Sequence, residues 1–285
     1  MTSPGLFTRI KELGEISNGK QKLLTQYFLS HFEQASFQNI SEIARRSHTS
    51  VATVLRFARA LGFPGFPALR NELQNILLEK LAPVERFSKM VPSLKSLEKT
   101  LHDGFQRELR NLHEMQKALD FSKLGRVARA ILRARKKYIL GLRAPAGCAY
   151  ILAFLLNHIL SDVIPALEGE TRVFEVMKSI GEKDLLVVFS YPRYTKSSLA
   201  ALQFARERGA LTVAITDSLM SPASQIAHFS LIAPAHSSNF ANSHTASLCM
   251  INLLITAISI IGRKKTEKGL RQMEKVLAGF NFFLE

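Results

Sequence analysis

The chain has 285 residues, of which 47% are hydrophobic, and a formal net charge of +15. This length and composition can supply two hydrophobic cores, and they exclude the disordered and collagen-like classes. Its two cysteines are too few for a disulfide framework or a four-cysteine zinc site, so we expect a reducing, cytoplasmic location.

The positive charge is distributed unevenly along the chain. Residues 1–80 contain 10 basic and 6 acidic residues, whereas residues 81–137 contain 14 basic and 6 acidic residues. Because the excess is concentrated in the first half, it favours a polyanionic partner there. The alternative interpretation is a pair of solvated helix faces.

The first 80 residues predict a compact helical unit. Apolar residues recur at helical spacing in residues 6–13 and again in residues 23–32. A short helix is expected in residues 39–46, and another begins after Ser50, whose hydroxyl can accept a hydrogen bond from a free backbone N–H. This helix is expected to end at Gly62, since glycine best adopts the left-handed turn. Two short helices joined by three or four residues predict a helix-turn-helix.

The second helix of such a motif can enter the major groove of double-stranded DNA, with its first residues at the base edges. Arg56 is the predicted base reader, because a guanidinium can bind O6 and N7 of guanine with two hydrogen bonds. Ser50 and Thr53 are predicted to bind phosphate oxygens, and Val51 or Ala52 to contact a thymine methyl group. Helix-turn-helix shapes also occur in proteins that bind no nucleic acid, so that alternative stays open on spacing alone.

The residues after this helix predict an aromatic corner. Pro64 and Pro67 prevent the helix from continuing, because proline lacks the backbone N–H. Phe63 and Phe66 can then fold back onto the helix and hold it rigid.

The stretch ISEIARRSHTSVATVLRFARALGFPGFPALR resembles the N-terminal domain of the RpiR family of bacterial transcriptional regulators. The resemblance covers roughly residues 3–80. It implies operator DNA as a partner, and it implies a homodimer or a larger even assembly whose two-fold symmetry matches a palindromic operator. One departure is His48, where the family usually has glycine in the turn; a histidine can adopt the left-handed conformation at modest cost.

Residues 81–120 predict a linker followed by a connecting helix. Apolar residues recur near heptad spacing from Leu97 to Met115, so we expect this helix to pack on the second domain or on a second subunit. The next segment, FSKLGRVARAILRARKK, predicts a helix with an apolar inner face and a row of arginines outside.

The remainder, residues 121–285, alternates short apolar strands with helices. This order predicts an α/β domain with a mainly parallel sheet flanked by helices. The expected strands are residues 137–142, 184–190, 211–216 and 228–233, and the expected helices are residues 147–160, 196–209 and 243–259. The longest apolar run, residues 249–261, is too short to cross a bilayer, so we expect no membrane partner.

Two loops fall where such sheets bind ligands, at the carboxyl ends of strands. Residues 141–147 and 190–198 form these loops, and each contains one arginine, Arg143 and Arg193. Neither loop has the glycine spacing of a dinucleotide-binding turn or a P-loop, so no nucleotide cofactor is expected. Exposed loop arginines without a ligand are the alternative interpretation.

The order of elements around YPRYTKSSLAALQFARERGALTVAITDSLMSPASQIAHFSL resembles the flavodoxin-like SIS (sugar isomerase) domain, over about residues 124–265. RpiR regulators join this domain to their helix-turn-helix. Its sugar-phosphate sites use Ser-x-Ser-Gly-x-Thr after the second strand, and here Pro192 and Arg193 replace the inner Ser and Gly. The resemblance therefore implies a site for a small anionic metabolite, such as a sugar phosphate, formed by Arg143, Ser190, Arg193, Thr195 and Ser243.

Isomerases related to these regulators carry the same domain, so an enzyme is an alternative. Aldose-ketose isomerisation needs a base, usually Glu or His, and Ser197 stands where the family's enzymes often have Glu. The nearest alternatives are His228, His236 and His244, and no metal is expected because the histidines lack metal-ligand spacing.

The sequence thus predicts a non-enzymatic, ligand-responsive transcriptional regulator of a carbohydrate or related metabolic operon. Two alternatives stay open: a sugar-phosphate isomerase, and a regulator whose SIS domain only dimerises.

Overall fold

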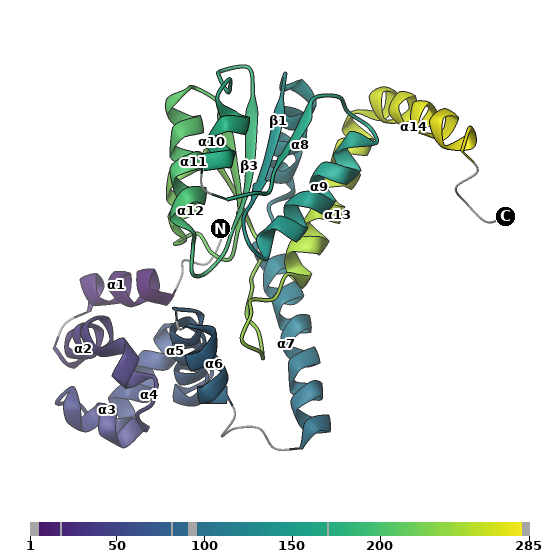
Figure 1. The fold of residues 1–285 in the computed structure, drawn as a ribbon. Coiled ribbons are helices and arrows are strands. Elements are labelled where there is room, and N and C mark those ends of the chain that lie inside the picture. The colour runs from purple at the N-terminus through teal and green to yellow at the C-terminus, as the bar shows by residue number, and fades with distance from the viewer. Residues whose placement is uncertain (1–5, 18, 81, 91–95, 170, 281–285) are drawn as a thin grey trace. The chain divides into compact units, whose positions relative to one another are not determined.

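The computed structural model describes residues 6–17, 19–80, 82–90, 96–169 and 171–280. The chain forms two compact units, Met1–Leu94 and Lys95–Glu285. Figure 1 shows the first as a group of helices in purple and blue, and the second as a sheet with helices in teal, green and yellow. Each unit has a hydrophobic core of its own, as the apolar content of the chain predicts.

The first unit is helical throughout its described residues. Its helices are α1 (Leu6–Ile16), α2 (Lys20–Ala35), α3 (Ile40–Arg46), α4 (Val51–Ala60), α5 (Phe66–Lys80) and α6 (Pro83–Met90). The core includes Phe28 and Phe57, whose stacked rings have centroids 5.4 Å apart. On α4, Val54, Phe57, Ala58 and the following Leu61 are buried, so the apolar face of this helix packs inward.

Helices α3 and α4 both end in left-handed turns. His48 has a φ of 53°, its N–H donates to Arg45 O, and the N–H of Thr49 donates to Ala44 O. After α4, Gly62 has a φ of 85° in the same type of turn. The left-handed conformations predicted at His48 and Gly62 are therefore confirmed; His48 sets the tight connection between α3 and α4, and Gly62 ends α4.

The corner after α4 differs in one respect from the prediction. Phe66 is buried and Phe63 packs partly buried against the same core, as expected. Pro67, however, lies in the first turn of α5, where its missing N–H has no intrahelical acceptor to lose. This proline therefore starts a helix that the sequence did not predict, and Pro64 alone lies in the connection.

The second unit contains a five-stranded parallel sheet in the order β2-β1-β3-β4-β5. Its strands are β1 (Lys137–Gly141), β2 (Val163–Ala166), β3 (Leu185–Ser190), β4 (Leu211–Thr216) and β5 (Phe229–Ile232). This is the flavodoxin-like order, and it confirms the predicted fold class. Strand β2 was not predicted, because its four residues include Pro165, and proline is tolerated only at a sheet edge such as this one.

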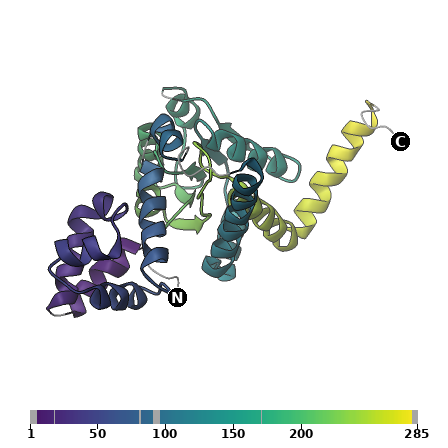
Figure 2. The ribbon, with the colours of Figure 1, turned by 90° about the horizontal axis from the view of Figure 1, so that it is seen from below.

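Helices cover both faces of the sheet (Figure 1). One face packs against α8 (Phe121–Arg133), α9 (Pro145–Asn157) and α13 (Thr245–Ile261), and the other against α10 (Thr171–Met177), α11 (Lys196–Glu207) and α12 (Pro222–Ile226). Helix α7 (Leu97–Ala118) joins the first face through the buried Met115. Helix α14 (Arg263–Ala278) extends away from the sheet, as Figures 1 and 2 both show.

The predicted helices at 147–160, 196–209 and 243–259 correspond to α9, α11 and α13, while α10, α12 and α14 were not predicted. Within the described part of the chain, no helix is by itself long and apolar enough to cross a membrane. Helices α13 and α14 meet that requirement only together, and the chain bends by 105° between them.

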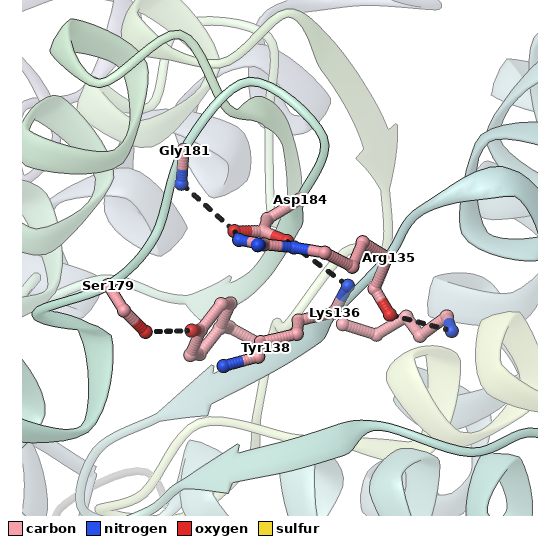
Figure 3. A network of polar contacts seen from close by, with 7 residues as sticks. Arg135, Lys136, Tyr138, Ser179, Gly181 and Asp184 are labelled. Atoms are coloured by element: carbon pink, nitrogen blue, oxygen red, sulfur yellow. Dashed lines mark hydrogen bonds and ion pairs between the residues drawn. The ribbon is translucent and has the colours of Figure 1, made fainter.

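A polar network ties the starts of β1 and β3 together (Figure 3). The Asp184 carboxylate accepts hydrogen bonds from Arg135 Nε at 2.9 Å and Nη2 at 2.8 Å, and from the N–H groups of Gly181 and Lys136. Burial alone would raise the pKa of Asp184, but the bonds from Arg135 and the two backbone groups outweigh it and lower that pKa. The network therefore stabilises the sheet at the N-terminal ends of its strands, opposite the carboxyl ends where the ligand site is expected.

Candidate functional site

The start of α4 holds three polar side chains in one connected row. Ser50 is the N-cap, and its Oγ accepts a hydrogen bond from Thr53 N–H at 3.2 Å. The Thr53 hydroxyl lies 2.8 Å from Ser50 Oγ and accepts a bond from Arg56 Nη2 at 3.3 Å. The spacing of three residues brings these side chains onto one side of the helix.

The predicted DNA-contacting residues differ in exposure. Ser50, Val51, Ala52 and Arg56 are exposed, so each is open to a partner. Thr53 is only 5% exposed, and its hydroxyl is shared between its two neighbours. Thr53 is thus arranged to support Ser50 and Arg56, whereas the sequence suggested direct contact with a phosphate.

The turn before α4 is held by its own side chains. Ser47 Oγ donates to Ile43 O at 2.7 Å and lies 2.9 Å from Thr49 Oγ1. At the other end of α3, Asn39 and Glu42 form a reciprocal capping box. These bonds stabilise both ends of α3 and order the turn that leads into α4.

At the carboxyl edge of the sheet, the loops after β1 and β3 each contain an exposed arginine in a left-handed conformation. Arg143 has a φ of 62° and Arg193 has a φ of 66°. For a residue with a Cβ this conformation costs about 1–2 kcal/mol, which glycine avoids. Arg193 therefore keeps the backbone conformation that suits the glycine of the SIS pattern while adding a positive charge.

The two hydroxyls of the loop after β3 have different surroundings. Ser190 is buried, and its Oγ has no hydrogen-bond partner among the described residues. Thr195 is the N-cap of α11; its Oγ1 accepts from Ser198 N–H at 3.3 Å and donates to Ser198 Oγ at 2.7 Å. Thr195 thus has a structural partner, whereas Ser190 retains an unused donor and acceptor.

The loop between β5 and α13 joins the same edge. Asn242 Nδ2 donates to Pro192 O at 3.0 Å, which links this loop to the one after β3. Ser243 is buried, and its Oγ donates to Glu108 Oε2 of α7 at 2.5 Å. The structure therefore brings Ser243 into the loop cluster that contains Ser190, Arg193 and Thr195.

A buried polar cluster lies beneath these loops. Tyr191 and Ser247 have their hydroxyl oxygens 2.6 Å apart, and the rings of Tyr191 and His244 pack edge to face with centroids at 5.1 Å. Burial raises the pKa of Cys148 on α9 to about 11, although a hydrogen bond with Ser247 lowers it, so this thiol is uncharged at neutral pH. Burial also lowers the pKa of His244, which favours a neutral imidazole.

The three histidines considered as catalytic bases have separate surroundings. The Nδ1 atom of His228 lies 2.8 Å from Thr212 Oγ1, and His236 Nε2 lies 3.6 Å from Glu114 Oε2. His244 lies beside Tyr191, and neither ring nitrogen has a hydrogen-bond partner among the described residues. Across those residues, no three His, Cys, Asp or Glu side chains gather in a way that could hold a metal ion.

Sequence reasoning missed the contributions of Glu108 and Asn242. Glu108 lies 135 positions before Ser243, on the polar side of a helix with a regular apolar stripe. Asn242 directly precedes Ser243, but an asparagine in a polar loop has many possible roles. Neither carries a local pattern that would have marked it.

Comparison with known proteins identifies both units. Residues 5–80 match the helix-turn-helix domain of the rpiR family, and residues 130–257 match the SIS domain. The HTH-type transcriptional regulator RpiR of Escherichia coli (strain K12) is 22% identical over 283 residues, covering 97% of this chain and 92% of that protein.

Two solved structures resemble the chain. The sugar isomerase domain of the RpiR transcription factor from Sphaerobacter thermophilus has 25% identity and a TM-score of 0.60, covering 64% of this chain and 99% of that one. The Vibrio vulnificus NanR protein complexed with ManNAc-6P has 20% identity and a TM-score of 0.58, covering 96% of this chain and 98% of that one. The relatives' names agree with the prediction of a regulator rather than an isomerase. The chain belongs to the RpiR family of transcriptional regulators, which combine a DNA-binding helix-turn-helix domain with an SIS domain.

Proposed function

We propose that the chain regulates transcription in response to a small anionic metabolite. In this proposal residues 1–80 bind operator DNA, residues 81–120 connect the domains, and residues 121–285 bind the effector and dimerise. The observation that carries it is the combination, in one chain, of an exposed helix start on α4 with a sheet edge whose loops present two arginines.

For the DNA contact, Arg56 reads a base edge. Its guanidinium is exposed, and a hydrogen bond to the Thr53 hydroxyl restricts its side-chain conformations. Less conformational entropy is therefore lost on binding. Ser50 binds a phosphate oxygen, and Val51 or Ala52 contacts a thymine methyl group. Thr53 contributes by positioning its two neighbours.

For the effector, Arg143 and Arg193 bind a phosphate or carboxylate group. Ser190, Thr195 and Ser243 hydrogen-bond the rest of the molecule. A buried hydroxyl without a partner is costly, so the unpaired Ser190 Oγ supports a ligand atom at this place. NanR, which has a similar fold, was solved with ManNAc-6P, so a sugar phosphate is the first class to test.

For assembly, α7 provides the dimer contact. Four apolar side chains at intervals of four residues lie exposed along it: Leu97 (75%), Leu101 (63%), Phe105 (64%) and Leu109 (44%). A continuous apolar stripe of this kind is stabilised by pairing with an equivalent stripe. A homodimer would also place two recognition helices on the two halves of a palindromic operator.

The test is a binding experiment with the full-length protein. Fluorescence anisotropy compares a duplex from the promoter beside the protein's own gene with a random duplex of equal length. We expect tighter binding to the promoter, and a change in that affinity on adding ManNAc-6P.

Three results would contradict parts of the proposal. Equal affinity for both duplexes would remove the specific DNA function, and the absence of any ManNAc-6P or inorganic phosphate binding would leave the SIS domain with dimerisation alone. Turnover of hexose or pentose phosphates that is lost on changing His236 or His244 would instead favour an isomerase.

A further inference from the structure

Helix α7 is bonded along the loop between β5 and α13 by several polar contacts. Arg107 Nε donates to Ser238 Oγ at 3.0 Å, and Asn111 Nδ2 donates to His236 O at 2.7 Å. Between them, Glu108 accepts the hydrogen bond from Ser243. Figure 1 shows this loop, in yellow-green, running beside α7. The effector loop and the connecting helix are therefore in direct contact.

The hydroxyl of Ser243 has only one proton to donate. Of its two acceptor contacts, Glu108 Oε2 at 2.5 Å is much shorter than Thr245 Oγ1 at 3.4 Å, so the proton is assigned to Glu108, while Ser243 Oγ accepts from Thr245 N–H at 3.3 Å. If an anionic effector accepts a hydrogen bond from Ser243 through any of its oxygens, it must take this same proton from Glu108. Its negative charge would also repel the Glu108 carboxylate.

We infer that Glu108 competes with the effector for the Ser243 hydroxyl, so that anion binding breaks this contact and loosens α7 against the loop. This inference rests on the proposed effector site. In this role Glu108 sets how tightly an anion must bind in order to displace it from Ser243 and loosen the connecting helix.

The position of α7 explains why this competition has a consequence beyond the site. Helix α7 is the first described element of the second unit, and the chain enters it directly from the helix-turn-helix unit. A change in how α7 is held therefore acts on the segment that tethers the DNA-binding unit. Asn242, bonded to Pro192 O, extends the same coupling to the loop that carries Arg193.

Linkage fixes the sign of the effect. If Glu108 and the anion compete, each weakens the binding of the other to Ser243 by the same factor. Weakening the Glu108 bond therefore strengthens anion binding. If Glu108 instead bound a hydroxyl of the effector, its loss would weaken binding. The two roles therefore predict opposite changes in affinity.

The test uses three full-length proteins: wild type, Glu108→Gln and the control Glu98→Gln. Glutamine keeps the size of the side chain and an acceptor oxygen but removes the charge. Glu98 is an exposed residue in the first turn of the same helix, so its variant matches the charge change. Calorimetric titration with ManNAc-6P, and separately with inorganic phosphate, measures affinity.

We expect Glu108→Gln to bind the anion at least about threefold more tightly than wild type, since a charge-assisted bond is replaced by a neutral one. Glu98→Gln should match wild type. Adding Ser243→Ala to Glu108→Gln should abolish the gain, because the shared hydroxyl is then absent.

Hydrogen exchange of α7 amides supplies a second readout. In wild type, the anion should speed exchange in residues 104–115 toward the rate that Glu108→Gln shows without ligand. If wild type binds the anion but Glu108→Gln binds it equally or more weakly, or if α7 exchange does not respond, the inference is wrong and the effector site stands. If wild type binds neither probe, the proposed effector site itself fails and the inference with it.

Discussion

At the scale of single residues, Arg193 places a positively charged side chain at a position whose backbone conformation favours glycine. Its φ of 66° is a conformation that glycine adopts freely, yet the residue here is an arginine. Residues in such conformations cluster at binding and active sites, and this supports the proposed role of its charge. Arg143, with a φ of 62°, has the same combination in the neighbouring loop.

We predict that Arg193→Ala weakens effector binding by about 1.5–3 kcal/mol, the usual range for a hydrogen bond to a charged group. Arg193→Gly should lose the same affinity but unfold at a higher temperature than Arg193→Ala, because glycine removes the left-handed strain. Calorimetric titration with ManNAc-6P and thermal unfolding measure the two effects. Unchanged affinity in both variants would return Arg193 to the class of exposed loop residues.

Arg56 is the residue on which sequence-specific DNA binding is expected to depend. We predict that Arg56→Ala costs about 1–3 kcal/mol on the specific promoter site and little on random DNA. Arg59→Ala is the matched control, since Arg59 is exposed on the last turn of the same helix. Equal losses on both duplexes would reassign Arg56 to phosphate contact.

Asp184 is a residue whose role is stability. We predict that Asp184→Asn lowers the free energy of unfolding by about 1.5–3 kcal/mol at pH 7, because the charge-assisted bonds to Arg135 are removed. Denaturant unfolding measures this, with the exposed Asp103→Asn on α7 as the control.

The pH dependence of this effect has a defined sign. Since the folded pKa of Asp184 lies below its ordinary value of about 3.9, its stabilisation is complete above that value. It is lost as the pH falls through the lowered folded pKa. The difference between wild type and Asp184→Asn should therefore narrow below about pH 4; a constant difference down to about pH 2 would show that the charge is not responsible.

At the scale of elements, α7 has a polar side and an apolar side with different surroundings. Its polar residues contact the loop before α13, and the buried Met115 packs on the core of the second unit. Its apolar stripe from Leu97 to Leu109 is exposed in the single chain. The predicted helix with near-heptad spacing is thus present, but only its later part packs on its own unit.

We predict that Leu101→Glu with Phe105→Glu converts a dimer into a monomer, because two charges would be buried in the apolar contact. Sedimentation velocity of the full-length variant measures the mass. Val84→Glu, at an exposed residue of α6, provides the control for an added surface charge. A variant that sediments as wild type does would exclude this stripe as the contact.

At the scale of the whole molecule, part of the charge excess lies outside the helix-turn-helix unit. Arg126, Arg129 and Arg133 are exposed along α8, which contains no acidic residue. If these arginines contact DNA, each phosphate contact releases counterions, and the affinity for DNA then falls as salt is added. If they form only a solvated face, they contribute nothing to this salt dependence.

We predict that changing these three arginines together to glutamine makes DNA binding less sensitive to salt. The slope of log affinity against log salt concentration should fall by about one for each phosphate group that the variant no longer neutralises. Anisotropy titrations on random DNA at several salt concentrations measure the slope. Arg172→Gln is the control, because Arg172 already pairs with Glu175. A slope identical to that of wild type would mean that the α8 arginines only face solvent.

The sequence by itself determined the features that depend on neighbouring residues. The cap at Ser50, the turns at His48 and Gly62, the buried face of α4 and four of the strands follow from local preferences and periodicity, and the structure confirms them. Resemblance to known families added the two domain types. The local preferences and the family motifs both lie within short stretches of sequence, so they can be recognised without the tertiary structure.

Tertiary structure alone decided the features that depend on packing between distant segments. Strand β2 forms because β1 offers it a hydrogen-bonding edge, although its four residues include Pro165, which cannot donate to a ladder. Thr53 is drawn into the core side of α4, and Glu108 meets Ser243 across 135 positions of sequence. Such contacts result from how helices and loops pack together, and no local pattern encodes the partner of a given side chain.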